Sequence, residues 1–224
     1  MRATQAKRVE DVSSLAESAY RLIEEMIVLR ELPPGSMISE SRLAEEVGCG
    51  RTPVREALLR LKHEGFIEVF PSRGAMVAPS DILKQMELLE VRRPLEDLVV
   101  RLAAKRATLD ERAEMRRLGV EIKRAAAVGD RKRYLRANRA VHEIKARAAR
   151  NATLEKTIGT INGLARRFWY AYIEDTGQFE KAAELHDSIL EKVAAGLPDQ
   201  ASAASSEFLD FLESLSRDAL ERRS

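Results

Sequence analysis

Two short helix patterns meet at a glycine-containing break before residue 60, and this junction constrains the fold more than any other feature of the chain. Ser39 or Glu40 is suited to begin the first helix, and Gly48 is suited to end it because glycine adopts a left-handed backbone at little cost. The second helix follows at once, with Thr52 expected as its N-cap and Pro53 at its first helical position. Two helices joined by so short a turn predict a helix-turn-helix.

The second helix pattern separates a buried side from an exposed side. Arg51, Thr52 and Arg55 point outward at its N-terminal end, which is the part of such a helix that reaches base edges in DNA. An arginine fork can pair with O6 and N7 of guanine, whereas threonine and the first N–H groups of the helix suit a phosphate. In the alternative, the two arginines lie on a solvated face and form ion pairs with Glu45, Glu46 or Glu56. Helical spacing predicts a buried stripe of Val54, Ala57, Leu58 and Leu61.

A strand pattern follows the second helix. Gly65 is suited to end that helix, residues 66–70 predict a strand, residues 71–74 a turn and residues 75–77 a returning strand. We expect a β-hairpin wing with Arg73 at its tip, where it can reach a minor groove.

Residues 15–79 resemble the winged helix-turn-helix domain of GntR-type bacterial transcription regulators. The resemblance is carried by L-P-P-G from Leu32, E-S-R-L-A-E-E-V-G from Glu40, R-T-P-V-R-E-A-L from Arg51, L-K-H-E-G from Leu61, and R-G from Arg73. It implies binding to double-stranded DNA. The implied contact residues are Arg51, Thr52, Arg55, Ser41, Gly50, Arg73 and Gly74.

Two positions depart from the family pattern. The family usually has Val-Ser where this chain has Cys49 and Gly50, and often arginine at Ser41. Glycine lacks the serine hydroxyl that can cap the helix or bind a phosphate. The missing arginine would alter a phosphate or base contact made from the first helix. Neither change affects the expected fold.

Composition limits the remaining possibilities. A chain of 224 residues has room for two domains, and 45% apolar residues suffice for ordinary cores. The single Cys49 excludes an internal disulfide and fits a reducing cytoplasm, and neither a signal peptide nor a long apolar span is found. Nothing in the sequence suggests a membrane. Residues 1–14 are polar and are expected as a flexible arm, with a helix extension as the alternative.

Charge is distributed unevenly, although the net charge is only +2. Residues 101–150 carry a net charge of +10, whereas residues 174–224 carry a net charge of −7. We interpret both segments as solvated faces that pair in part with each other when the helices pack. A basic face that helps to hold DNA is the alternative.

The second half of the chain is a succession of helix patterns without a strand signal. With the N-terminal domain, this predicts a mainly α fold: an arm at 1–14, a winged helix-turn-helix at 15–79, and an all-α bundle at 80–224 for effector binding and dimerisation. Six helices are predicted at 82–107, 110–128, 130–149, 152–175, 178–195 and 198–222.

This helical region resembles the all-helical ligand-binding domain, called FCD, of the FadR branch of GntR regulators. The resemblance is carried by V-R-R-P-L-E from Val91, L-A-A-K-R-A-T from Leu102, N-R-A-V-H from Asn138 and L-H-D-S-I-L from Leu185. The region has six predicted helices rather than seven, which makes it similar to the shorter, VanR-type version of this domain. The motifs are looser than those of the DNA-binding half.

In that family the bundle often encloses a divalent metal, such as zinc, nickel or manganese, held by an aspartate and three histidines. The corresponding positions in this chain are Asn138, His142, His186 and Phe208. An amide oxygen is a weaker ligand than a carboxylate, and a phenyl ring is no ligand at all. We therefore expect His142 and His186 to form hydrogen bonds in a metal-free pocket, with metal binding or simple core filling as alternatives.

Other residues of the bundle are candidates for binding an effector. Arg92 lies where family members often direct an arginine at the ligand, and a bidentate grip on a carboxylate is its natural role. Its alternative is an ion pair with Glu96. Asn162, Arg166 and Tyr170 are expected on one face of the helix at 152–175, whereas Phe168, Trp169, Tyr170 and Tyr172 are expected as core or dimer contact. The full expected effector set is Arg92, Asn138, His142, Asn162, Arg166, His186 and Phe208.

The sequence thus predicts a cytoplasmic, homodimeric, DNA-binding transcription regulator, a repressor by family habit, whose bundle senses a small metabolite such as an organic acid. A larger or more apolar effector than a small hydroxy acid would fit Phe208. A first alternative is a metal-dependent enzyme. The sequence argues against it, because it has no H-E-x-x-H motif, no nucleophile elbow and no phosphate loop. A second is a protein-binding scaffold with a decayed DNA-binding domain.

Overall fold

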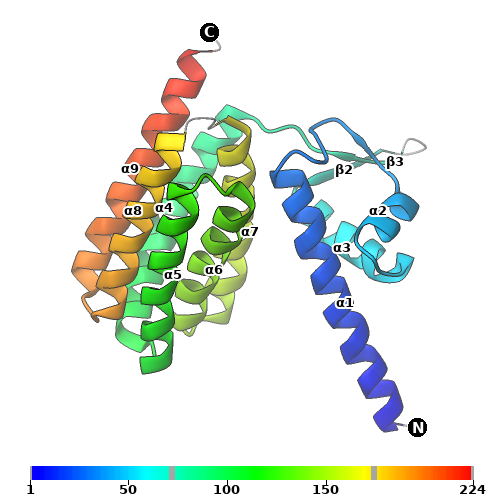
Figure 1. Cartoon of the computed structure of the whole chain (residues 1–224), viewed down its shortest axis with the longest axis horizontal. Helices are drawn as coiled ribbons and strands as arrows, with labels where there is room; N and C mark the ends of the chain where they lie inside the picture. The colour runs from blue at the N-terminus through cyan, green and yellow to red at the C-terminus, as the bar shows by residue number, and fades with distance from the viewer. Residues whose placement is uncertain (1, 71–73, 173–175, 223–224) are drawn as a thin grey trace. The chain divides into compact units, whose positions relative to one another are not determined.

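The computed structural model divides the chain into two compact units, Met1–Ser80 and Asp81–Ser224 (Figure 1). It describes the backbone of residues 2–70, 74–172 and 176–222, and the side chains of residues 15–70, 74–171 and 178–222. Within these ranges the fold is mainly α, with one small sheet in the first unit, as the sequence predicts. No helix of the described ranges combines the length and apolar character that a membrane crossing requires.

The first unit is a winged helix-turn-helix. Its helices are α1 (Arg2–Val28), α2 (Glu40–Glu46) and α3 (Arg51–His63), and its strands are β1 (Met37–Ile38), β2 (Ile67–Phe70) and β3 (Gly74–Val77). The predicted hairpin is present, since β2 and β3 pair antiparallel with Glu68 opposite Met76. Strand β1 was not predicted. It joins the other edge of β3, which gives the antiparallel order β1-β3-β2.

Two local expectations for this unit differ from the structure. Residues 1–14 were expected as a flexible arm with a helix extension as the alternative, and the structure shows the alternative, since α1 begins at Arg2. Helix α3 begins at Arg51 with Gly50 as its N-cap, so Thr52 is not the cap and Pro53 is the third helical residue rather than the first. Proline is tolerated there because the N–H groups of a first turn have no partner within the helix.

The helix-turn-helix is held by the apolar stripe that helical spacing predicts. Val54 and Leu61 of α3 are fully buried, as are Ile23 of α1 and Phe66 beyond α3. Ser39 caps α2 by accepting a hydrogen bond from the backbone N–H of Arg42 at 3.4 Å. Gly48 has a φ of 67°, the left-handed conformation expected of the residue between the two helices.

The second unit is a bundle of six helices in the described ranges, in agreement with the sequence. Asp81, Thr108 and Asp130 are N-caps, and Thr108 forms a complete capping box with Glu111. Gly177, which falls between the helices predicted at 152–175 and 178–195, lies in the first turn of a helix. The helices are α4 (Ile82–Arg106), α5 (Leu109–Ala127), α6 (Arg131–Ala148), α7 (Ala152–Tyr172), α8 (Thr176–Ala194) and α9 (Pro198–Glu221).

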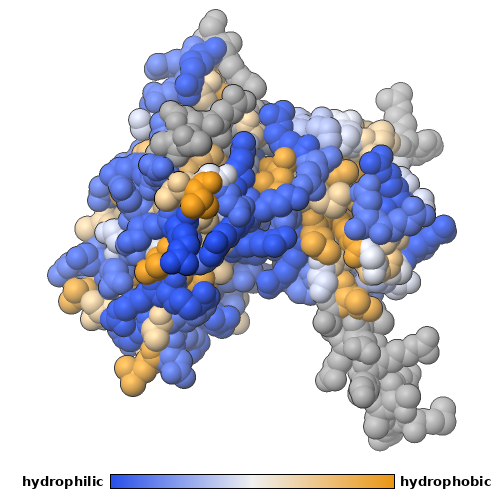
Figure 2. All heavy atoms as spheres, viewed as in Figure 1, coloured by the Kyte–Doolittle hydropathy of each residue, from blue (hydrophilic) through white to orange (hydrophobic). Residues whose placement is uncertain are grey.

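The charged residues of the bundle pair extensively with one another. Arg133 contacts Glu121 at 2.5 Å, Arg150 contacts Glu111 at 2.8 Å, and Lys123 pairs with Asp187. The face shown in Figure 2 is mostly hydrophilic over the bundle, with isolated apolar side chains. This supports the interpretation of a solvated, partly paired surface.

Candidate functional site

The N-terminal end of α3 presents the polar residues that the sequence assigns to DNA. Arg51, Thr52 and Arg55 are exposed, whereas Val54 and Ala57 between and behind them are buried. The helix therefore offers a polar edge at its first two turns while its opposite side is fixed in the core. This is the arrangement that a recognition helix needs in a major groove.

Arg55 does form an ion pair, but with a partner that the sequence did not suggest. Its Nε lies 2.6 Å from Oε2 of Glu40, the first residue of α2, instead of pairing with Glu45, Glu46 or Glu56. Both side chains are largely exposed, at 62% and 43%. An exposed pair of this kind stabilises a fold by only about 0–1 kcal/mol, so the guanidinium can exchange the carboxylate for another acceptor.

The remaining expected DNA contacts lie beside α2, α3 and the wing. Ser41 is exposed, and its hydroxyl is 3.1 Å from that of Ser39. A Cβ at Gly50 would meet only Pro53 at 3.8 Å, so the serine usual in the family would fit there. Gly74 begins β3 with a φ of 87°. Arg73 lies outside the described residues.

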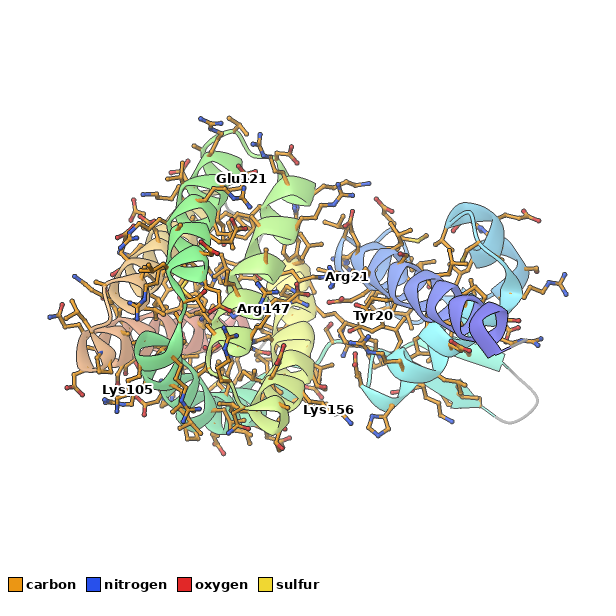
Figure 3. All side chains as sticks on the ribbon, turned by 90° about the horizontal axis from the view of Figure 1, so that it is seen from below. Tyr20, Arg21, Lys105, Glu121, Arg147 and Lys156 are labelled. Carbon is orange, nitrogen blue, oxygen red and sulfur yellow. The ribbon has the colours of Figure 1, made fainter. Side chains whose placement is uncertain are left out.

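A cluster of polar side chains fixes α3 against α1. The Arg60 guanidinium lies 3.7 Å from the centre of the Tyr20 ring and forms ion pairs with Glu17 at 2.7 Å and Glu64 at 2.9 Å. The Tyr20 hydroxyl donates to Glu64 at 2.7 Å. Burial raises the pKa of Tyr20, and the carboxylates of Glu24 and Glu64 raise it further. Figure 3 shows Tyr20 on α1, the helix that these contacts join to α3.

In the second unit, all seven residues expected to bind an effector line one pocket. They come from α4, α6, α7, α8 and α9, and the pocket encloses about 480 Å³ of space between atoms, some of it open to solvent. The sequence therefore selected positions that the fold brings together. The other lining residues are Gln85, Tyr134, Ala165, Phe168, Trp169, Ala182, Leu212, Leu215 and Ser216.

The pocket wall corrects one expectation about α7. Tyr170 does not line the pocket; its hydroxyl donates to the backbone oxygen of Arg131 at 3.1 Å. An advance of eight residues turns a helix about 80° beyond two full turns, which carries Tyr170 away from Asn162. Phe168 and Trp169 are buried in the core, as expected, and they also line the pocket. The side chain of Tyr172 lies outside the described residues.

A fully buried charged cluster lies behind the pocket. Arg92 Nη2 is 3.4 Å from Glu96 Oε1, so the expected ion pair exists, and Lys145 Nζ is 3.2 Å from Glu96 Oε2. His142 Nδ1 lies 3.4 Å from Glu96 Oε1, and its Nε2 lies 3.5 Å from Arg92 Nη2. Two basic side chains thus share one carboxylate, away from water.

The environment sets the protonation of this cluster. Burial alone would raise the pKa of Glu96, but Lys145, His142 and Arg92 hold it well below its usual range. Burial lowers the pKa of His142 to about 3, and the neighbouring Lys145 acts in the same direction. Burial also lowers the pKa of His186. Both histidines are therefore neutral at physiological pH, with Glu96 ionised.

The second histidine lies between an amide and a phenyl ring. His186 Nε2 is 2.9 Å from Asn138 Nδ2, and its ring centre is 4.3 Å from that of Phe208 and 5.0 Å from that of His142. The four positions that the family resemblance assigned to a metal do converge. Their chemistry does not fit one, because each Nε2 already has a close polar neighbour and Phe208 offers no donor. Among the described residues, no group of three or more histidine, cysteine or acidic side chains is suited to hold a metal ion.

Sequence reasoning missed part of the site. Lys145 was not singled out, although it lies three residues after His142 on α6 and so shares its face. Gln85 was missed too, although it precedes Arg92 by seven residues, two turns of α4. The sequence did hold a signal for both residues: each is a polar residue that recurs at helical spacing on a helix side that is otherwise apolar.

Most of the buried side-chain nitrogen and oxygen atoms without a hydrogen-bond partner, within the described ranges, belong to residues of this pocket. They include Arg92 Nε, Asn138 Oδ1, Asn162 Oδ1, Trp169 Nε1 and His186 Nδ1. An unpaired buried polar atom costs about 1–3 kcal/mol, so their concentration at one place is typical of a binding site.

Comparison with known proteins places both units in described families. Residues 15–77 match the bacterial regulatory proteins of the gntR family, and residues 87–211 match the FCD domain. The chain is 30% identical over 193 residues to a probable D-xylose utilization operon transcriptional repressor of Paenarthrobacter nicotinovorans, covering 86% of this chain and 84% of that protein.

Other similarities are partial or concern the fold. An uncharacterized HTH-type transcriptional regulator in an unstable DNA locus of Streptomyces ambofaciens is 44% identical over 62 residues, which is 28% of this chain and only 26% of that protein. The solved structure of E. coli McbR/YncC superposes with a TM-score of 0.77 at 22% identity, covering 91% of this chain and 97% of the other. At that identity the superposition shows a common fold.

Proposed function

Because the chain belongs to the GntR family of bacterial transcriptional regulators and carries an FCD domain, we propose that it is a homodimeric repressor controlled by a small organic acid. The family and the relatives are regulators rather than enzymes, which removes the metal-dependent enzyme considered above. A regulator that reads chromosomal DNA acts in the cytoplasm. The Paenarthrobacter relative is named a probable repressor, and for this chain repression is part of the proposal.

Arg51, Thr52 and Arg55 form the proposed reading edge. One recognition helix covers only a few base pairs, so useful affinity needs two copies related by a two-fold axis on a pseudo-palindromic operator. When DNA binds, Arg55 gives up its ion pair with Glu40 and contacts a base edge. Arg51 contacts a second base or a phosphate, and Thr52 binds a phosphate. The wing, with Gly74 at the start of β3 and Arg73 before it, contacts the adjacent groove or backbone.

Effector control is supported by the pocket around buried Arg92, because several buried polar atoms there have no hydrogen-bond partner. A carboxylate would accept hydrogen bonds from the guanidinium and balance the extra positive charge of the cluster. The pocket joins five helices, and one of them, α4, carries Arg92 and is the first element of the second unit. Repacking of α4 on binding would favour one DNA-binding state over the other.

Selection of binding sites from fragmented genomic DNA tests this function. Wild type is compared with the double variant Arg51→Ala/Arg55→Ala and with Arg217→Ala, which removes an exposed arginine of α9 as a charge control. We expect a short palindrome to be enriched by wild type and by the control only. Folded wild type that enriches no sequence, with or without a panel of organic acids, would favour the scaffold alternative instead.

A further inference from the structure

The side chains at the positions that the family resemblance assigns to a metal already contact other groups. His142 Nε2 faces the Arg92 guanidinium at 3.5 Å, and His186 Nε2 faces the Asn138 amide at 2.9 Å. Phe208 packs on the His186 ring and lies 5.6 Å from the Arg92 guanidinium carbon, so it closes the side from which a third imidazole would reach. A divalent ion between the histidines would have two imidazole nitrogens and at most the neutral amide oxygen of Asn138 as ligands, next to the Arg92 cation.

We propose that this pocket binds its effector without a metal ion, the Arg92 guanidinium binding the effector's carboxylate directly. The proposal rests on the proposed function in taking this pocket as the effector site. Arg92 carries a fixed positive charge to the place where the two histidines and Asn138 meet. It supplies the electrostatic attraction for an anion that a metal would otherwise supply.

The charge balance of the cluster supports an anion at this place. Arg92 and Lys145 are both buried and share the single carboxylate of Glu96, so the cluster holds two basic side chains and one acidic side chain. Arg92 Nε lacks a hydrogen-bond partner. A bound carboxylate would use that N–H and complete the charge balance, which is the condition under which buried charges are tolerated.

The rest of the wall indicates what the carboxylate is attached to. Phe168, Trp169, Phe208, Leu212 and Leu215 line the pocket together. These side chains fit an aryl or branched alkyl body, because burying apolar surface contributes about 25 cal/mol per Å². We therefore assign to the pocket a monocarboxylate with an apolar body. Since Arg166 also lines the wall, a dicarboxylate belongs in the test as a competing ligand class.

The single tryptophan gives a direct probe of occupancy. Trp169 is the only tryptophan of the chain and lines the pocket, so its fluorescence should respond to a ligand there. The full chain is titrated with phenylacetate, benzoate, hexanoate and isovalerate, with phenylacetamide as the uncharged match and succinate as the dicarboxylate. Each titration is run with and without EDTA. We expect at least one monocarboxylate to bind equally well in both conditions, and neither phenylacetamide nor succinate to compete with it.

Variants at two neighbouring arginines separate the role of Arg92 from general charge. Arg92→Gln should weaken the monocarboxylate about 10- to 100-fold, and Arg92→Lys should restore only part of this because it lacks the planar fork. Arg93→Gln is the matched control, since Arg93 pairs with Asp210 and Glu213 and does not line the pocket. Circular dichroism verifies that each variant is folded.

Metal binding is measured on the same protein after dialysis against Zn²⁺, Ni²⁺ or Mn²⁺, by elemental analysis and by the melting temperature. Wild type should retain no stoichiometric metal, whereas Asn138→Asp/Phe208→His, which restores the four ligands, is the positive control for retention. One equivalent of metal in wild type, or ligand binding abolished by EDTA, would overturn the proposal. So would the failure of every monocarboxylate to bind, or an unaltered affinity in Arg92→Gln.

These outcomes are distinguishable from a failure of the proposed function. If operator DNA is selected but no carboxylate binds, the regulator stands and the assignment of this pocket fails. If a monocarboxylate binds through Arg92 but leaves the affinity for operator DNA unchanged, the pocket assignment stands and effector control fails.

Discussion

At the scale of single residues, the proposed DNA-reading edge depends on which acceptor Arg55 contacts. In the free protein its Nε lies 2.6 Å from Glu40 Oε2, and both side chains are largely exposed. Such a pair stabilises the fold by about 0–1 kcal/mol, so it orients the guanidinium without preventing exchange. Glu40 is therefore expected to restrain Arg55 from random phosphate contacts while leaving it available to a base.

Glu40→Gln should raise the affinity for DNA of unrelated sequence by about 3- to 10-fold, because it frees Arg55 and removes a negative charge near the phosphates. Affinity for the operator should rise less, so discrimination falls. Fluorescence anisotropy with operator and shuffled duplexes at two salt concentrations measures both. Glu213→Gln, on α9 in the other unit, should change neither. An unaltered affinity for the shuffled duplex would show that Glu40 does not restrain Arg55.

The buried histidine His142 gives the stability of the protein a pH dependence. Unfolded, His142 takes up a proton near its ordinary pKa of 6.5, whereas burial lowers its pKa in the folded protein to about 3. Between these values the unfolded chain binds more protons, so the free energy of unfolding falls as the pH falls. The slope from this group approaches about 1.4 kcal/mol per pH unit.

Urea unfolding between pH 7 and pH 5 tests this expectation. His142→Gln should reduce the slope in that range without abolishing it, because the buried His186, whose pKa is also lowered, remains. His63→Gln should keep the slope of wild type, since His63 is exposed. A His142→Gln slope as steep as that of wild type would exclude His142 as its source.

At the scale of elements, one arginine joins the ends of two helices. Arg112 of α5 donates to the backbone oxygens of Ala104 and Ala107 at the end of α4, at 2.8 Å and 3.1 Å. It also donates to those of Ala194 and Val193 at the end of α8, at 2.8 Å and 3.3 Å. The last carbonyl groups of a helix have no partner within it, so one guanidinium satisfies groups that two helices leave open.

Arg112→Ala should lower the free energy of unfolding by about 2–4 kcal/mol, because partly buried carbonyl oxygens lose a charged donor. Arg117→Ala is the matched control on the same helix. It removes an exposed pair with Glu114, and its effect should stay below about 1 kcal/mol. Urea titrations followed by circular dichroism give both values. Equal effects of the two substitutions would contradict a capping role for Arg112.

At the scale of the whole molecule, DNA recognition is expected to need two chains. A full pseudo-palindrome should bind this protein at least about 10-fold more tightly than a duplex in which one half-site is scrambled, since the second contact becomes intramolecular. Gel shifts give the two affinities, and sedimentation of the complex gives its stoichiometry. One chain bound per operator, with equal affinity for both duplexes, would contradict the dimer.

The sequence by itself determined the elements and the positions of interest. Helical spacing identified the buried stripe of α3 and the six helices of the bundle, because burial of one helix side leaves a local periodic signal. The family resemblance supplied five pocket positions, helical spacing supplied Asn162 and Arg166, and all seven meet around one space. The sequence did not determine the N-cap of α3. Thr52 was predicted and Gly50 is observed, since either residue can precede a helix.

Only the tertiary structure decided which of these residues touch. It paired Arg55 with Glu40, fifteen residues away, and added the two-residue strand β1 to β3, a pairing too short to leave a pattern in the sequence. It placed Lys145 and Arg92 on the same carboxylate and put Trp169 rather than Tyr170 in the pocket. Such contacts depend on how separate helices rotate and pack against each other, and no local periodicity records that rotation.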